Sequence, residues 1–173
     1  MPENAIPAYI TSLIRHFEDL REGTHGGSAS REGKEAHFER AVQLLAPIAR
    51  KVLAEMNTSL LLDTGQLTET GLRRTPDGGL SASWALSWPE QRASGLPPLA
   101  LQAYFGGAFH HPHLRGTTVE DWPLNVFDEK DAFAQRSILR AIASCDLHNL
   151  VYRADFRIVP AVTNPATPLG DET

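Results

Sequence analysis

The spacing of apolar residues changes once along this 173-residue chain, and that change constrains the fold more than any other feature. Up to about residue 57 the apolar residues recur every three or four positions, which is the period of an amphipathic helix. From about residue 67 they alternate with small or polar residues, which is the period of a half-buried strand. Because helices come first and strands follow, the order favours an α+β fold over a doubly wound parallel sheet.

Two helices are predicted in the N-terminal third. The first covers residues 5–22, where five apolar side chains form a single stripe: Ile6, Ile10, Leu13, Phe17 and Leu20. The glycine-rich segment 23–33 is expected to be a flexible linker, so that the first helix either packs loosely or docks on a partner subunit. The second helix covers residues 34–57, and Pro47 is expected to kink it or split it in two.

The strands are predicted downstream of these helices. A turn at residues 75–79 joins two strands of a hairpin, 66–74 and 80–88, and residues 99–105 form a third strand. A helix is expected over residues 128–144, and residues 147–159 are predicted as the last strand.

These elements predict a twisted, mainly antiparallel sheet of about four strands, with the N-terminal helices and one late helix packed on one face. We expect a single α+β domain over residues 1–162, in which residues 1–33 form a helix and linker that move. A disordered tail over residues 163–173 is expected to follow.

Charge and composition exclude several classes of function. The net charge is −5 and the 16 Lys and Arg residues are scattered, which argues against nucleic acid as a partner. No run of about 20 apolar residues is present, so no membrane-spanning helix is expected. The single cysteine, Cys145, fits a cytoplasmic protein without disulfides. The sequence also lacks a nucleotide- or flavin-binding motif.

The densest group of potentially reactive side chains lies between residues 106 and 125. Pro112 biases His111 toward an extended conformation, so His111 and His113 are expected to share one side of the chain. His148 is expected on the apolar face of the last predicted strand, where a buried imidazole needs a partner. Three imidazoles with an open fourth position suit a mononuclear zinc or iron ion, so His111, His113 and His148 are the predicted metal ligands.

Neighbouring residues supply the rest of the predicted site. His111 and His113, with Glu120 and Asp121, are the predicted catalytic residues, because carboxylates near imidazoles serve as further ligands, orienting groups or general bases. Without a metal the same imidazoles would act as a general acid and base.

A substrate-binding set is predicted beside these residues. Arg115 is expected to hold a carboxylate or phosphate of an anionic substrate, with Trp122 and Tyr104 as aromatic walls of its pocket.

Two hypotheses of function follow. The first is a small-molecule enzyme of lyase, isomerase, hydrolase or oxygenase type that uses this histidine cluster. The alternative is a non-catalytic module that binds a ligand or a protein partner through the loop 104–127. In that alternative, histidine substitutions would lower affinity or stability without a loss of turnover. A purely structural interpretation is also open, in which the loop histidines are surface residues and His148 is hydrogen-bonded in the core. A homodimer formed through the first helix is a further hypothesis.

Overall fold

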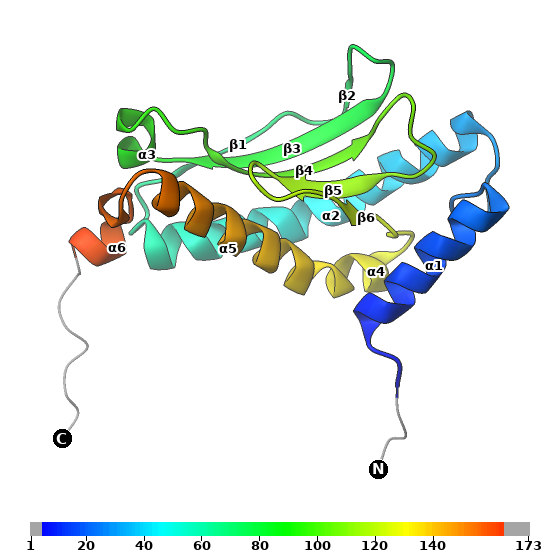
Figure 1. Ribbon diagram of the computed structural model, residues 1–173, viewed down its shortest axis with the longest axis horizontal. Coiled ribbons are helices and arrows are strands. Elements are labelled where there is room, and N and C mark those ends of the chain that lie inside the picture. The colour runs from blue at the N-terminus through cyan, green and yellow to red at the C-terminus, as the bar shows by residue number, and fades with distance from the viewer. Residues whose placement is uncertain (1–4, 165–173) are drawn as a thin grey trace.

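The computed structural model describes residues 5–164 and has the predicted α+β architecture (Figure 1). The helices are α1 (Ala8–Glu22), α2 (Arg31–Leu60), α3 (Pro89–Ala93), α4 (Glu129–Ala134), α5 (Arg136–Arg153), the 3-10 helix η1 (Phe156–Ile158) and α6 (Pro160–Thr163). The strands are β1 (Gln66–Glu69), β2 (Arg73–Arg74), β3 (Leu80–Ser87), β4 (Leu99–Phe105), β5 (His113–Gly116) and β6 (Trp122–Pro123).

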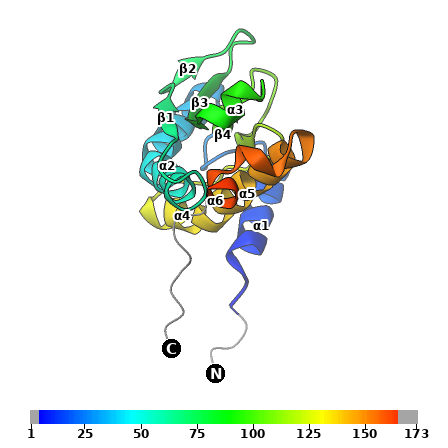
Figure 2. The same ribbon diagram turned by 90° about the vertical axis from the view of Figure 1, so that its left-hand side faces the viewer.

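The strands form one antiparallel open sheet in the order β1-β3-β4-β5-β6, with β2 paired to the other half of β3. Figures 1 and 2 show this sheet as one layer and α2 and α5 side by side as a second layer beneath it. The opposite face of the sheet is open. Helix α1 lies at one end of the molecule, against the edge strand β6.

The alternation that predicts the hairpin also explains the core. Along β3 the burial alternates strictly, so Leu80, Ala82, Trp84 and Leu86 face the helices while the serines between them face the open side. One apolar face of α2 is buried against them. Its members are Phe38, Val42, Leu45, Ala49, Val52 and Met56. The late helix also starts where it was predicted, because the Asp128 side chain caps it by accepting a hydrogen bond from the Asp131 backbone N–H at 2.7 Å.

The predicted strand over residues 147–159 is wrong. Helix α5 continues to Arg153, and η1 and α6 follow it. Its buried residues are spaced for a helix: Leu139, Ile142, Ala143, Asp146, Leu147 and Leu150. The alternation that suggested a strand includes Tyr152, which is 87% exposed. Packing of the helical stripe on the sheet therefore decides the conformation of this segment.

Three other predictions change in detail. Pro47 does not split α2, which runs unbroken through it while both of its halves pack on other elements. The irregular segment 106–127 contains the short strands β5 and β6, which extend the sheet beyond the expected four strands. Thr163 lies in α6, and the rest of the predicted disordered tail, from residue 165, lies outside the described residues. Within residues 5–164, no helix has the length and apolar character needed to cross a bilayer.

Candidate metal centre

Five of the seven histidines gather where α1 meets the edge of the sheet. His16 lies on α1, His25 lies in the α1–α2 connection, and His37 lies on α2. His111 lies just before β5, and His113 is the first residue of that strand. His25 and His111 are buried, being 0% and 2% exposed, and their ring centroids lie 4.3 Å apart.

Three ligand atoms converge at the centre of this cluster. The Nδ1 atom of His25 lies 2.9 Å from Nε2 of His111, and Oδ2 of Asp19 lies 3.3 Å from the same Nε2. The third edge, between His25 Nδ1 and Asp19 Oδ2, measures 3.7 Å. We call Asp19, His25 and His111 the triad. Its atoms lie within 4.8 Å of one another, which fits a shared metal ion.

These distances match a particular coordination geometry. Ligands at about 2.0–2.1 Å from a tetrahedral zinc ion stand roughly 3.3–3.4 Å from one another. The three edges of 2.9, 3.3 and 3.7 Å bracket that value. Small side-chain movements would therefore bring all three atoms to zinc-binding distance.

Hydrogen bonds orient two members of the triad. The Nδ1–H of His111 donates to the Pro112 backbone carbonyl at 2.9 Å, and since a carbonyl only accepts, a neutral His111 carries its lone pair on Nε2. The hydroxyl of Thr24 donates to Oδ1 of Asp19 at 3.2 Å, which leaves Oδ2 for the two imidazoles. Such outer contacts commonly orient metal ligands.

With Asp19 ionised and both imidazoles neutral, the protons of the triad do not satisfy every contact. A neutral His25 can donate from Nδ1 to the lone pair of His111 Nε2. The Asp19 carboxylate still faces that lone pair at 3.3 Å with no proton between the two atoms. Two acceptors at this distance repel each other, and a bound cation would turn the repulsion into attraction.

Burial keeps the imidazoles neutral, which is the form that binds metals. Burial first, and then the neighbouring His111, lower the pKa of His25 to about 3. Burial and the same neighbour lower the pKa of His16 to about 4, while Asp19 acts in the opposite direction. The pKa values of His111 and His113 are also lowered, in both cases mainly by burial.

The sequence of α1 explains how its residues reach the cluster. Ser12, His16 and Asp19 follow one another at helical spacing and form the inward face of α1, on which Ser12 and His16 are buried. The side-chain amide Nδ2–H of the buried Asn125 donates to the Ser12 carbonyl at 3.0 Å and fixes the helix to the segment after β6. The buried face of helix α1, which packs at the edge of the sheet, is therefore polar.

A tight turn brings His25 back under α1. The backbone of His25 and Ser28 exchanges two hydrogen bonds, and Gly26 and Gly27 between them have positive φ angles of 59° and 80°. A Cβ at Gly26 would lie 2.7 Å from the Phe127 ring, so only glycine fits there. The linker expected at residues 23–33 therefore contains a defined turn that places His25.

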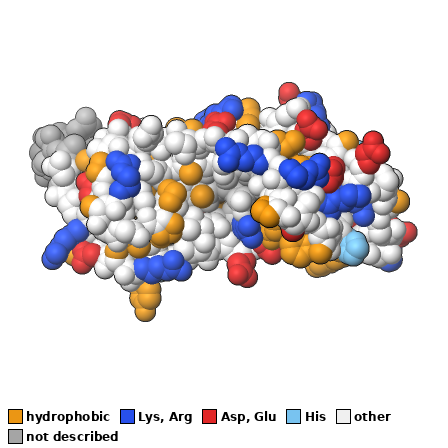
Figure 3. All heavy atoms as spheres, turned by 90° about the horizontal axis from the view of Figure 1, so that it is seen from above, with side chains coloured by type: hydrophobic (Ala, Val, Ile, Leu, Met, Phe, Trp, Pro, Cys, Tyr) orange, Lys and Arg blue, Asp and Glu red, His pale blue; other side chains and the backbone are white. Residues whose placement is uncertain are grey.

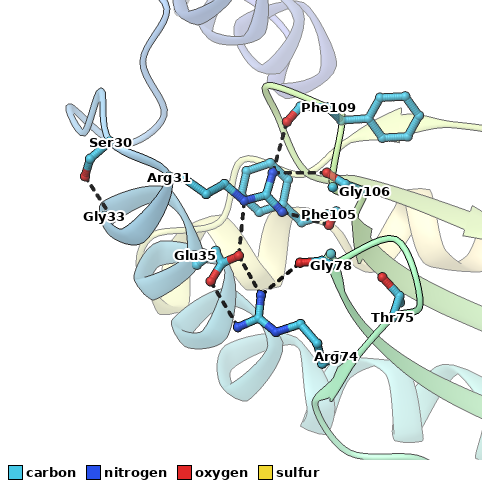
Figure 4. Close-up of polar contacts among 12 residues, drawn as sticks. Ser30, Arg31, Gly33, Glu35, Arg74, Thr75, Gly78, Phe105, Gly106 and Phe109 are labelled. Carbon is cyan, nitrogen blue, oxygen red and sulfur yellow. Dashed lines mark hydrogen bonds and ion pairs between the residues drawn. The ribbon is translucent and has the colours of Figure 1, made fainter.

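A second network fixes the loop that carries His111. As Figure 4 shows, the Arg31 guanidinium donates to three backbone carbonyls, those of Phe105, Gly106 and Phe109, at 3.0–3.2 Å. Its Nε donates to Glu35, whose carboxylate also accepts hydrogen bonds from Arg74. The start of α2 is thereby joined to the end of β4 and to Phe109, which lies two residues before His111.

An acidic cleft of about 480 Å³ reaches Asp19 from solvent. The charged residues that line it are Arg15, Glu18, Asp19, Asp128 and Asp131. Only Arg15 is basic, and it pairs with Asp131 at 3.2 Å. The cleft therefore carries excess negative charge, which would attract a cation toward the triad.

The structure places His148 away from the predicted metal site. His148 is exposed on α5, and its Nδ1 lies 3.2 Å from the Asn149 side chain. His113 lies beside the triad, with its ring centroid 6.0 Å from that of His111. Within residues 5–164, neither belongs to a group of three ligand atoms close enough to share an ion. The predicted set of His111, His113 and His148 is therefore wrong, and His111 alone of the three is retained.

Four other predicted residues lie together on the open face of the sheet. The hydroxyl of Tyr104 donates to Asp121, and the Arg115 guanidinium stacks 4.0 Å above the Tyr104 ring. His113 lies beside them, with its ring centroid 6.0 Å from that of Tyr104. Burial, followed by the Asp121 carboxylate, raises the pKa of Tyr104 to about 12, so this phenol stays protonated.

The last two predicted residues lie at the margin of that face. Glu120 lines a groove next to Arg115. Trp122 packs against the core from β6, and its indole Nε1 is buried without a hydrogen-bond partner among residues 5–164.

Sequence reasoning missed Asp19 and His25, together with the neighbouring His16. One signal was present, because the polar residues Ser12, His16 and Asp19 recur at helical spacing beside the apolar stripe of the first helix. Such a pattern usually marks a solvated face, and only the fold shows that this one is turned inward.

No protein-family model, curated protein or solved structure matches this chain. The chemistry of the site is therefore the basis on which a function can be assigned.

Proposed function

We propose that this protein binds one divalent transition-metal ion, zinc by the fit of its ligands, at the triad. The observation that supports this most is the arrangement of Asp19, His25 and His111 around a common point, at separations close to those of tetrahedral ligands. Two imidazoles and one carboxylate form a ligand set typical of zinc sites in which the protein supplies three ligands.

Three protein ligands support a catalytic role more than a structural one. Structural zinc sites usually have four protein ligands, whereas catalytic sites keep one position for water or substrate. The acidic cleft that reaches Asp19 offers access to such a position. A zinc ion there would lower the pKa of a bound water and polarise a carbonyl or phosphoryl group.

The charge of the cleft also modifies the class of substrate expected from the sequence. Arg115, the predicted anchor for an anionic group, does not line the acidic cleft. We therefore propose that a molecule entering this cleft is neutral or cationic, and that the reaction is a metal-assisted hydrolysis or a related addition of water.

Metal titration tests the proposal. Tag-free protein is stripped with a chelator and titrated with zinc chloride in a calorimeter, and we expect one ion per chain. Asp19→Asn and His111→Gln should each weaken the affinity at least about 100-fold, since even the loss of an outer contact costs 10- to 100-fold. His148→Gln and His110→Gln, which alter exposed histidines, are the matched controls and should leave the affinity unchanged. An absence of stoichiometric zinc, or equal losses in both pairs of variants, would refute the proposal.

A second candidate function is the binding of a small anion on the open face of the sheet. The groove there has a volume of about 530 Å³, and its polar lining includes Ser83, Gln102, Arg115, Thr117 and Arg153. Figure 3 looks onto this face, where several Lys and Arg side chains stand among hydrophobic and uncharged ones.

The support for this candidate is the way Arg115 is held. Its Nε donates to the Gln102 side chain, and its Cζ lies 4.0 Å from the centroid of the Tyr104 ring. These contacts position the guanidinium, whose terminal amino groups can donate to a carboxylate or phosphate. Titration with inorganic phosphate and with malonate should give binding that Arg115→Gln abolishes and that the exposed Arg73→Gln preserves. Equal binding by both variants would exclude the groove.

A further inference from the structure

Helix α1 is amphipathic in the opposite sense to an ordinary surface helix. Its inward face is polar, whereas Ile6, Phe17 and Leu20 of the apolar stripe predicted from the sequence are exposed and its other two members are half-buried. Five large apolar side chains in and just before α1 are 43–61% exposed: Ile6, Tyr9, Ile14, Phe17 and Leu20. Apolar residues concentrated on one helix in this way mark an interaction surface rather than the scattered exposure normal for a protein.

We propose that a second copy of this chain covers the stripe, so that two α1 helices pack against each other in a symmetric homodimer. The proposal rests on the surface of α1 and does not depend on metal binding at the triad.

The area available is sufficient for a dimer of moderate affinity. Large apolar and aromatic side chains have about 150–250 Å² of surface, so five that are roughly half exposed present about 450–500 Å² per chain. Two copies would thus cover about 900–1,000 Å² of apolar surface in total, which with a polar rim reaches the lower limit of specific interfaces. Figure 1 shows α1 at one end of the molecule with its outer side uncovered, so a second copy can approach without meeting the sheet.

The charges of α1 favour an antiparallel orientation of the two copies. All the charged residues of the helix follow Ile14, and none lies between Ala8 and Ile14. In an antiparallel pair centred near Leu13, the charged half of each helix lies beside the uncharged half of the other. No like charges then face each other, whereas a parallel pair would bring Glu18 next to its own copy. A two-fold axis perpendicular to the helices generates such an antiparallel pair.

Mass in solution tests the proposal, measured by light scattering and by sedimentation over a range of protein concentrations. We expect a reversible dimer whose dissociation constant rises at least about 30-fold in Phe17→Glu, as for the central residue of an interface. Tyr152→Glu is the matched control, because it changes an 87% exposed aromatic residue on α5 in the same way, and the dimer should persist in it. Circular dichroism checks that each variant folds.

Charge-swapped variants test the antiparallel orientation. In a pair centred near Leu13, Ile6 of one copy lies opposite Leu20 of the other. Ile6→Arg and Leu20→Glu should each weaken the dimer, and the double variant should restore it through an ion pair between the copies.

Three outcomes would overturn the proposal. The first is a wild-type protein that stays monomeric at every concentration, which would mean that the apolar surface of α1 does not bind a second copy. The second is a dimer whose dissociation constant Phe17→Glu does not change. The third is a control variant, Tyr152→Glu, that weakens the dimer as much as Phe17→Glu does. Zinc stoichiometry is measured separately, so failure of the dimer and failure of the metal site are distinguishable.

Discussion

Nδ1 of His25 lies 2.9 Å from Nε2 of His111, although 86 residues separate them along the chain. Helix α1 and the turn that follows it contribute two of the three triad residues, and the segment before β5 contributes the third. An ion bound between them would cross-link the N-terminal segment to the sheet. Metal binding and stability should therefore be coupled.

We expect zinc to stabilise the protein against urea. A free zinc concentration 100 times the dissociation constant should add about 2.7 kcal/mol to the free energy of unfolding, relative to protein in chelator. His25→Gln should abolish this increment because it removes one ligand of three. His148→Gln, an exposed histidine, should retain it. An equal increment in both variants would mean that zinc acts elsewhere.

The metal-free protein should lose stability on mild acidification. Unfolded histidines bind protons near pH 6.5, whereas the pKa values of folded His25 and His16 are about 3 and about 4. Between these limits the unfolded state binds more protons, so the free energy of unfolding falls as the pH falls. Each group contributes about 1.4 kcal/mol per pH unit.

Urea unfolding at pH 7, 6 and 5 in the presence of a chelator measures this dependence. His16→Asn should flatten the pH dependence, and His110→Asn, at an exposed position, should not. A slope that His16→Asn leaves unchanged would show that other groups cause the acid sensitivity.

Arg31 should tune the metal site without contacting it. Its guanidinium holds the carbonyls of Phe105, Gly106 and Phe109, and lysine cannot reach all three with one amino group. We expect Arg31→Lys to loosen the loop before His111 and to weaken zinc binding about tenfold, while zinc stoichiometry stays at one. Arg40→Lys changes an exposed arginine of the same helix and serves as the control. Unchanged zinc affinity in Arg31→Lys would show that the loop is positioned by other contacts.

The sequence predicts the sheet and the helical core because their signals are local. The strict alternation in β3 and the apolar face of α2 each specify one face of one element, and the core is built from those faces. The segment after Ser144 carries both patterns, since Leu147 and Leu150 fit a helix while His148, Leu150 and Tyr152 fit a strand. Contacts with the sheet and with α2 decide between helix and strand, and the local spacing of residues does not reveal these contacts.

The candidate site was predictable only in part, for the same reason. His111 stands out because three histidines surround Pro112. Asp19 and His25 become its neighbours only after α1 folds back on the edge of the sheet, and each looks like an ordinary surface residue in its own segment. The error on His148 followed directly from the wrong strand, because a helix turns that imidazole to solvent.

Asp146 should be the most sensitive polar position outside the metal centre. Its buried carboxylate accepts hydrogen bonds from the backbone N–H groups of Thr117 and Thr118 and from the Thr118 hydroxyl, at 2.6–2.8 Å. Asp146→Ala would leave these donors unpaired next to the core, so we expect a loss of about 3 kcal/mol or more in the free energy of unfolding. Asp155→Ala, in which the lost carboxylate is half-exposed, should cost well under half as much. Because Asp146 joins α5 to the turn after β5, a small effect in Asp146→Ala would show that this turn is held by the sheet alone.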